Sequence, residues 1–434
     1  MTAILASLQY GTAQEATPTL TTLHNFAGPP GDGAYPYASV VIDGDGALFG
    51  VSVFGGASGG TGGDGALFSL KAPKTSGASW TEGVLHNFNG GDPGYAAYPY
   101  GTLVIGGAAG GHPVLYGTTS GGGSTGLWGT VFSLTPPQSA GAHWTATTLY
   151  VFSGGSDGAY PVGGVVVGAG GVLYGTTSAG GIAQGASGYG TVFCLTPPAL
   201  SGGAWTETVL YTFKGGINGP DGAIPEGGVT IGSGSSEQPV LYGTTFSGGT
   251  LGYGAVFSLQ PPTSGEGGAW TETVLHNFAG GVADGFNPNA GVAIGSGGVL
   301  YGTTESGGAF LLGAVFSLTP PASGQGQAWT ETVLYSFAGG SDGAYADAGV
   351  AIGGGGTLYG TTYNGGTSGR GTVFALSPPS VAGSPWTERV LHSFLGGGDG
   401  ANPEAAVAIY GRTLYGTTFY GGTSGFGTVF SLTP

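Results

Sequence analysis

An aspartate recurs once in every copy of a repeated segment of this chain, and six of the seven are followed directly by glycine: Asp32, Asp92, Asp157, Asp221, Asp284, Asp342 and Asp399. Carboxylate oxygens are the ligands that hard cations such as Ca²⁺ prefer, so a ring of them at one channel mouth could bind calcium. Aspartate also accepts hydrogen bonds within its own Asp-Gly turn. Because a residue present in every copy is normally needed by the copy itself, we expect the turn role. We predict no cofactor, with Ca²⁺ as the one alternative.

Acidic residues that do not recur could instead do general acid and base chemistry. Glu226 and Glu404 each follow a proline at the same point of their copies, and the other candidates in loops are Glu305, Asp347 and Arg370. Glu226 and Glu404 are therefore the candidate acid and base of a carbohydrate-active lyase or hydrolase. The chain has no nucleophile elbow in context, no metal-ligating histidine pair and no phosphate-binding loop. These absences favour a protein that is not an enzyme.

Aromatic residues stand among glycines in one loop of each copy. They are Phe54, Trp128, Tyr189, Tyr253, Phe310, Tyr363, Phe419, Tyr420 and Phe426. Loops on a rigid scaffold commonly carry function, and aromatic rings there could stack on sugar rings or anchor a protein partner. The same rings could fold back over their own loops. The sequence leaves these two alternatives open, and we treat all but Phe54 as candidate ligand-binding residues.

The unit that carries these residues occurs seven times. Leu-Tyr-Gly-Thr-Thr begins at residues 115, 173, 241, 300, 358 and 414, Leu48 begins a degenerate copy, and the spacing is 56 to 68 residues. Within residues 348–394, four alternating runs at 348–353, 357–362, 371–376 and 386–394 are bounded by glycine and proline. Such runs predict four antiparallel strands, hence one blade of an all-β, seven-bladed β-propeller per copy. The first run is small and apolar on both faces, which places it innermost.

The two ends of the chain complete each other. Residues 20–26 form a lone outer strand, and residues 427–432 form a third strand with no outer strand after it. We therefore predict that the N-terminal strand pairs with the last blade and closes the ring, which removes exposed sheet edges. Residues 18–434 then form a single propeller domain. Residues 1–17 resemble the remnant of a signal peptide, and we expect this leader to be disordered.

Composition excludes some partners. The chain has 434 residues, 100 glycines, six lysines plus arginines and a net charge of −16. Phosphate groups would meet repulsion and no basic stripe, so a nucleic-acid partner is excluded and anionic membranes are disfavoured. No stretch has the roughly 18 consecutive apolar residues that a membrane span needs. We expect a monomer.

Two more ring positions recur. One is His24, His86, His276 and His392 in four copies and Tyr150, Tyr211 and Tyr335 in the others. A position that accepts either ring indicates packing with a polar tip. The second is a tryptophan that begins six outer strands, usually as Trp-Thr-Glu, and its regularity favours rim packing over sugar stacking: Trp80, Trp144, Trp205, Trp270, Trp329 and Trp386.

Three quoted segments carry a family resemblance: Leu-Tyr-Gly-Thr-Thr at 300–304, Gly-Thr-Val-Phe at 371–374 with its counterpart at 314–320, and Leu-Tyr-Ser-Phe-Ala-Gly-Gly-Ser-Asp-Gly-Ala at 334–344. Over about residues 19–434 the chain resembles the GloVer-type tandem repeat of secreted bacterial proteins. The resemblance implies an extracellular or cell-surface location in bacteria and supplies no catalytic residue. Members are called choice-of-anchor proteins because different C-terminal anchors follow their repeats, a pattern from which this chain departs by ending at Pro434.

The sequence therefore predicts an extracellular, non-enzymatic propeller scaffold. Its glycine- and aromatic-rich loop face would bind a glycan or a cell-surface protein. The alternative is a carbohydrate-active enzyme whose site lies at the mouth of the central channel.

Overall fold

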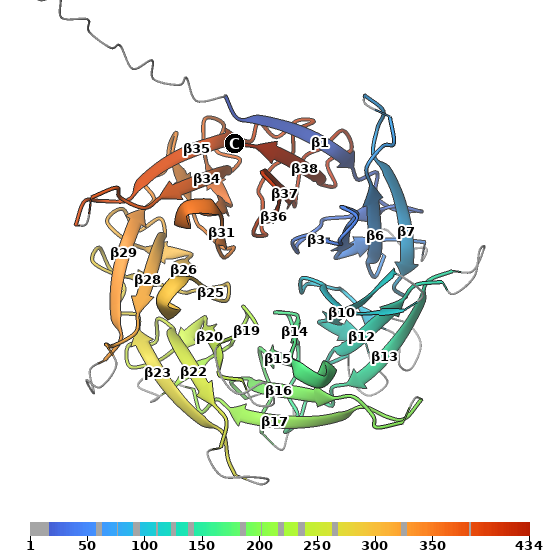
Figure 1. Ribbon diagram of the computed structural model, residues 1–434, viewed down its shortest axis with the longest axis horizontal. Coiled ribbons are helices and arrows are strands. Elements are labelled where there is room, and N and C mark those ends of the chain that lie inside the picture. The colour runs from blue at the N-terminus through green and yellow to red at the C-terminus, as the bar shows by residue number, and fades with distance from the viewer. Residues whose placement is uncertain are drawn as a thin grey trace, which may run out of the picture.

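The computed structural model is a closed ring of seven four-stranded antiparallel sheets, the blades of a β-propeller (Figure 1). The predicted fold is confirmed. The structure describes residues 17–57, 63–75, 77–89, 96–109, 112–122, 127–137, 143–182, 188–200, 202–215, 221–232, 239–262, 268–322, 328–381 and 383–434. All but the last residue of the predicted leader lies outside these residues. Among them, no helix is long and apolar enough to cross a lipid bilayer.

Each blade takes its strands in chain order from the channel to the rim. Blade 1 consists of β3 (Val41–Ile42), β4 (Leu48–Ser52), β6 (Ala66–Lys71) and β7 (Thr81–Asn87), and blade 2 of β9 (Val104–Ala109), β10 (His112–Thr119), β12 (Thr130–Thr135) and β13 (Thr145–Val151). Blade 3 consists of β14 (Val165–Val167), β15 (Leu173–Thr177), β16 (Thr191–Thr196) and β17 (Thr206–Thr212), and blade 4 of β19 (Val229–Ile231), β20 (Leu241–Thr245), β22 (Ala255–Gln260) and β23 (Thr271–Asn277). Blade 5 consists of β25 (Ala293–Ile294), β26 (Leu300–Thr304), β28 (Ala314–Thr319) and β29 (Thr330–Ser336). Blade 6 consists of β31 (Ala351–Ile352), β32 (Leu358–Thr362), β34 (Thr372–Ser377) and β35 (Thr387–Ser393).

Blade 7 joins the two ends of the chain. It consists of β36 (Ala408–Tyr410), β37 (Thr413–Thr418) and β38 (Thr428–Thr433), with β1 (Thr19–Asn25) as its outer strand. The antiparallel pairing of β1 with β38 runs from Thr19 opposite Thr433 to Asn25 opposite Thr428, and Figure 1 shows the two strands side by side. The predicted closure by the N-terminal strand is confirmed.

The glycine of each Leu-Tyr-Gly-Thr-Thr copy makes room for a phenylalanine of the third strand. In blade 6, a Cβ atom on Gly360 would lie 2.5 Å from the ring of Phe374, which is fully buried. The corresponding distances in the other six blades are 2.4 to 2.7 Å. Any larger residue would have to displace a core ring, which a close-packed interior resists.

Phenylalanine pairs hold neighbouring blades together. The third-strand phenylalanine of each blade meets, edge-on, a buried phenylalanine that follows the outer strand of the preceding blade. The ring centroids are 5.1 to 5.4 Å apart in Phe26–Phe68, Phe88–Phe132, Phe152–Phe193, Phe213–Phe257, Phe278–Phe316, Phe337–Phe374 and Phe394–Phe430. Edge-to-face ring pairs add stability beyond that of their buried area, so this repeated contact helps to hold each blade against the next.

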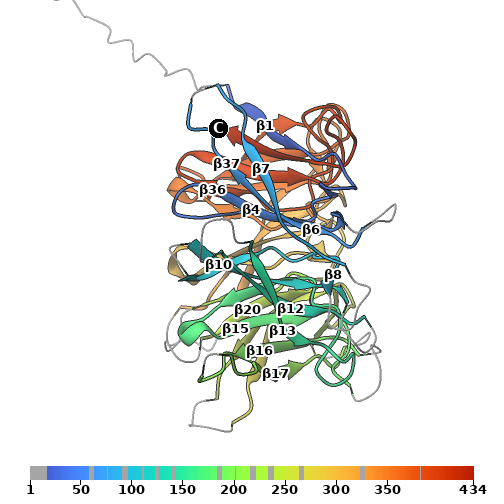
Figure 2. The same ribbon diagram turned by 90° about the vertical axis from the view of Figure 1, so that its right-hand side faces the viewer.

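The six tryptophans pack at the rim, as the sequence indicates. Each lies against the second-strand ring of the preceding blade at 5.9 to 6.5 Å: Trp80–Tyr415, Trp144–Phe49, Trp205–Tyr116, Trp270–Tyr174, Trp329–Tyr242 and Trp386–Tyr301. The outer strands β7, β13 and β17 lie along the rim of the ring, which Figure 2 shows edge-on. Tryptophan at this position therefore joins blades.

Short elements that the sequence did not indicate occupy the loops. Five two-stranded sheets join the connection after an outer strand to the loop after the second strand: β2 (Gly33–Ala34) with β5 (Phe54–Gly55), β8 (Ala96–Ala97) with β11 (Gly121–Gly122), β18 (Gly222–Ala223) with β21 (Ser247–Gly248), β24 (Gly285–Phe286) with β27 (Ser306–Gly307), and β30 (Gly343–Ala344) with β33 (Asn364–Gly365). Turns between inner and second strands include the 3-10 helices η1 (Ala169–Gly171), η3 (Ser296–Gly298) and η4 (Gly354–Gly356). The paired loops therefore lie on one face of the disc, and the turns between inner and second strands lie on the opposite face.

Candidate functional site

One residue of each blade, which we call the slot residue, stands just before the inner strand and lines a central cavity of about 440 Å³. The slot residues are Tyr37, Tyr100, Val162, Glu226, Asn289, Asp347 and Glu404. Blade by blade around the ring, five residue types occupy one structural position. The cavity wall between them is made of small residues and backbone, such as Gly163, Gly227 and Ala290.

Threonines of neighbouring blades fix the slot. In blades 4 to 7 the first threonine of Leu-Tyr-Gly-Thr-Thr donates its hydroxyl to the carbonyl of the residue that follows the slot residue of the next blade, whereas Thr118 and Thr176 at the same position have no hydrogen-bond partner among the described residues. These bonds are Thr244 to Ala290 (2.8 Å), Thr303 to Ala348 (2.8 Å), Thr361 to Ala405 (2.9 Å) and Thr417 to Ala38 (3.0 Å). In these blades a threonine of the repeated motif therefore holds the backbone beside the slot residue, whose own type differs from blade to blade.

Carboxyl groups crowd one part of the cavity. Burial, together with the charges of Glu404 and Glu305, raises the pKa of Asp347 to about 8. Burial and Glu305 raise the pKa of Glu404 to about 7, and the same two causes raise the pKa of Glu226. Oδ1 of Asp347 is buried and accepts no hydrogen bond from the described residues. At neutral pH these groups therefore share protons among themselves rather than all being charged.

Aromatic rings form the adjoining part. Tyr37 and Tyr100 of neighbouring blades meet edge-on with centroids 5.1 Å apart, and Phe419 lies 6.3 Å from Tyr37. Tyr37 is hydrogen-bonded to Asn289, and burial followed by the charges of the cavity carboxylates raises its pKa, so the phenol stays protonated. Tyr35 continues the cluster, 5.2 Å from Phe419.

The predicted catalytic pair lies in this cavity. The structure brings Glu226 and Glu404 to the same mouth, with Asp347 between their blades and Glu305 close enough to influence all three. Arg370 lies elsewhere, over Gly396 in the connection that follows an outer strand. Sequence reasoning did not include Tyr37, Tyr100 or Asn289, although the shared position before the inner strand could have found them.

Six of the eight candidate aromatic residues fall into two groups, and Tyr420 and Phe310 belong to neither. Four of them cover a glycine in the connection after the outer strand of their own blade: Trp128 over Gly154, Tyr189 over Gly215, Tyr253 over Gly280 and Phe426 over Gly28. Phe419 and Tyr363 share another position and lie at the channel mouth, where the charges of Glu404 and Asp347 help to raise the pKa of Tyr363. Tyr420 follows Phe419 and is 41% exposed, and Phe310 is 58% exposed in a turn.

The recurring aspartates bond within their own blades. Asp157 accepts from Ser153 N–H (2.8 Å) and from the hydroxyl of Tyr150 (3.0 Å). The same pair of partners, a loop N–H and the recurring histidine or tyrosine, serves Asp32, Asp221, Asp284, Asp342 and Asp399. None of these six lines the central cavity, and Asp92 lies outside the described residues.

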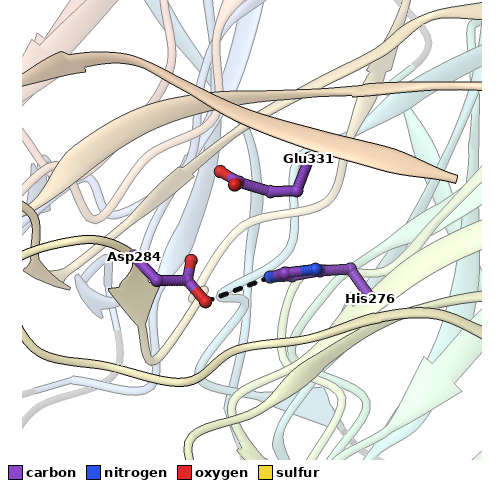
Figure 3. A group of neighbouring side chains, drawn as sticks. All are labelled: His276, Asp284 and Glu331. Atoms are coloured by element: carbon purple, nitrogen blue, oxygen red, sulfur yellow. Dashed lines mark hydrogen bonds and ion pairs between the residues drawn. The ribbon is translucent and has the colours of Figure 1, made fainter.

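A glutamate of the next blade adds a third group at some of these positions. In Figure 3, Glu331 on β29 faces Asp284 and His276, and the three ligand atoms lie within 4.8 Å of one another. His276 and Asp284 are 3.2 Å apart, and Asp284 also accepts from the N–H groups of Ala279 and Gly285 at 2.7 Å. Oε1 of Glu331 is buried with no partner among the described residues, and burial and Asp284 raise its pKa to about 7.

Similar junctions occur at four other aspartates, three with tyrosine in place of histidine and one, at Asp32, with His24. Glutamates with a buried Oε1 and a raised pKa face Asp157, Asp221 and Asp342 as well as Asp32, and they are Glu207, Glu272, Glu388 and Glu82. Because a neutral phenol is a poor ligand for divalent cations, the property common to all five junctions is not a metal-ligand set. It is a pair of carboxyl groups, one of which has a pKa raised first by burial and then by the charge of the other.

Two stretches that together span the chain, residues 1–237 and 235–434, match the sequence profile of the Gloeobacter/Verrucomicrobia repeat. The chain belongs to this family. The GloVer-type resemblance is thereby confirmed, and the propeller gives this Gloeobacter/Verrucomicrobia repeat protein its structural unit, one blade per copy. No curated protein matches the chain in sequence.

Solved structures similar to this Gloeobacter/Verrucomicrobia repeat protein include a candidate 6-phosphogluconolactonase from Bacteroides uniformis, with a TM-score of 0.48, 15% identity and coverage of 87% of this chain and 88% of that one. A second is a puromycin-hydrolysing peptidase from Mycobacterium tuberculosis, with a TM-score of 0.43, 10% identity and coverage of 91% of this chain and 53% of that one. A Trypanosoma rangeli sialidase (0.38, 11%) is covered over 58% by 96% of this chain. At these values no activity is carried over to this protein.

Proposed function

We propose that the protein is an extracellular, non-enzymatic scaffold that binds a glycan at the mouth of its central channel. The observation that supports this proposal is the slot. Seven blades of one sequence pattern present tyrosine, valine, glutamate, asparagine and aspartate at one structural position around a cavity of about 440 Å³. Variation confined to a position that the framework holds fixed is typical of a binding surface.

The chemistry of the cavity suits a saccharide. Sugar rings have apolar faces that stack on aromatic rings and hydroxyl groups that donate to carboxylates and amides. Tyr37 and Tyr100 supply the rings, with Phe419 packed against Tyr37, while Asn289 and the carboxyl groups supply the polar partners. Pockets that combine apolar walls with a few convergent polar groups are the usual form of a small-ligand site.

A glycan array tests the proposal, followed by titration of each hit. Tyr37→Ala and Tyr100→Ala should weaken binding about tenfold or more, because a lost ring contact costs on the order of 1.4 kcal/mol. Phe310→Ala is the matched control, since it removes an exposed ring outside the cavity. An array without hits, or equal losses in all three variants, would contradict a glycan site at the channel mouth.

An enzyme is the second candidate, and the protonation of the cavity supports it. A carboxyl group with a pKa of about 8 beside one with a pKa of about 7 gives a proton donor and a partly ionised base at neutral pH. Release of reducing ends from neutral polysaccharides, or of unsaturated ends from polysaccharides that contain uronic acids, tests this candidate. Activity abolished by Glu226→Gln or Glu404→Gln would replace the scaffold proposal, whereas binding without turnover would retain it.

A further inference from the structure

The cavity has an unbalanced charge. Its lining includes Glu226, Asp347 and Glu404, with Glu305 nearby, and among the described residues that line it there is no lysine, arginine or histidine. Every charged neighbour that influences Asp347 is another carboxylate, namely Glu404 and Glu305. The whole chain carries a net charge of −16. No cationic side chain described in the cavity offsets the remaining negative charge, so a ligand with positive charge would meet attraction and an acidic one repulsion.

Asp347 also has unused hydrogen-bonding capacity. Its Oδ1 atom is buried and has no hydrogen-bond partner in the described part of the chain, whereas Asp284, the comparable carboxylate of an interblade junction, accepts three hydrogen bonds. A buried acceptor without a donor is unfavourable. A ligand that brings N–H donors to this atom would therefore gain both a hydrogen bond and charge neutralisation.

Aromatic rings next to the carboxyl groups restrict the shape and chemistry of such a ligand. The pair Tyr37 and Tyr100, in the two blades that follow the blade of Glu404, offers ring faces and edges within the same cavity. A ring face attracts a cation as well as the apolar face of a sugar. A bare metal ion would use the carboxylates alone, whereas an aminated sugar would use both parts of the cavity.

We propose that the channel mouth selects saccharides that carry a protonated primary amine, such as oligomers of glucosamine. The ammonium group lies among Asp347, Glu404 and Glu226, and the sugar ring lies against Tyr37 and Tyr100. This inference rests on the proposed glycan-binding function and narrows its ligand class. The same backbone sugar with its amines acetylated is the natural reference, because it differs only in charge and in donor number.

Calorimetric titration at pH 7 and low salt, using the full chain, compares three hexasaccharide probes: glucosamine, N-acetylglucosamine and galacturonic acid. We expect the glucosamine hexamer to bind about tenfold or more tightly than the acetylated one and the acidic oligomer not to bind. Asp347→Asn and, separately, Glu404→Gln should reduce the preference toward one. Asp45→Asn is the control, because it removes one exposed charge in a turn of blade 1 away from the cavity.

Each other outcome has a definite meaning. Equal binding of the amine and acetylated hexamers would overturn this inference and leave the glycan-binding function standing. No binding of any saccharide would count against both. If spermidine or Ca²⁺ displaces the glucosamine hexamer with equal affinity and Asp45→Asn weakens binding as much as Asp347→Asn, the attraction is general to an acidic protein and the site is not selective. Melting temperatures of the variants, measured alongside, exclude loss through misfolding.

Discussion

At the scale of single residues, the recurring aspartates contribute to stability through their own turns. Asp157 accepts a backbone N–H, a serine hydroxyl and a tyrosine hydroxyl. Asp157→Asn leaves one acceptor oxygen in place of two and should cost about 1 kcal/mol, the value of one hydrogen bond. Chelation with EDTA should leave the melting temperature of the native protein unchanged. A melting temperature that falls by many degrees in EDTA and recovers with Ca²⁺ would instead show a metal site.

A glycine of the repeated motif offers a second residue-scale prediction. A methyl group at Gly360 would meet the ring of buried Phe374 at 2.5 Å, so Gly360→Ala should destabilise the protein by about 1 to 3 kcal/mol. Gly397→Ala is the control, because nothing lies within 4 Å of its added Cβ atom. Urea denaturation midpoints of the two variants measure the difference. Equal midpoints would mean that the ring of Phe374 moves aside without cost.

Sequence reasoning at this scale found the acidic residues of the cavity and missed its neutral ones. Glu226 and Glu404 stand out because a proline precedes each, and Asp347 is among the loop candidates, whereas Tyr37 follows Pro36 in the same way but has no acidic group to draw attention to it. The sequence also could not show that Glu331 would face Asp284, because the two belong to different blades and their contact depends on how one blade packs on the next. Partners across blades are set by the rotation from one blade to the next, which no spacing along the chain records.

At the scale of elements, β1 is the strand on which the ring depends. Its pairing with β38 covers the free edge of blade 7, and Phe26 directly after it is fully buried against Phe68 at 5.1 Å. Deletion of residues 1–27 should therefore cause aggregation or a stability loss well beyond the roughly 0.5 to 3 kcal/mol of a point mutation. Size-exclusion chromatography and thermal melting measure both effects.

Deletion of residues 1–16 alone is the control for that truncation, since β1 begins at Thr19. We expect this shorter deletion to melt like the full chain. If the longer deletion did so too, the N-terminal strand would not be needed to close the ring.

The strand order of each blade was predictable because apolar alternation and glycine-rich turns mark it locally. The five small two-stranded sheets were not, because two residues give no periodicity.

At the scale of the whole molecule, the interblade glutamates predict an unusual dependence of stability on pH. Burial raises the pKa values of Glu207, Glu272, Glu331 and Glu388 to about 7. Between their ordinary pKa of about 4.5 and this value the folded protein binds more protons than the unfolded chain, so stability falls as pH rises through this window. The melting temperature should therefore be higher at pH 5 than at pH 8.

Glutamine at Glu331 and Glu388 should flatten that slope, because an amide does not titrate. Asp284 acts in the opposite sense. Burial alone would raise its pKa, but the hydrogen bonds from His276 and the backbone outweigh this effect and lower it. The stability that Asp284 contributes is therefore lost only below its ordinary pKa of about 3.8, outside this window. Melting curves from pH 4 to pH 9 for the native chain and the double variant decide the matter. A melting temperature that rises from pH 5 to pH 8 would contradict the proposed role of the junctions.

The threonines that donate to the backbone beside the slot have a consequence for how such proteins diverge. Thr303, for example, bonds the carbonyl of Ala348 whatever side chain stands at position 347. Selection can therefore exchange a slot residue without touching the residues that fold the blade, and each duplicated blade adds one further position open to such exchange. A lineage could therefore change its ligand by substitutions at the slot positions of one rim while the scaffold stays constant, much as an engineered display library does.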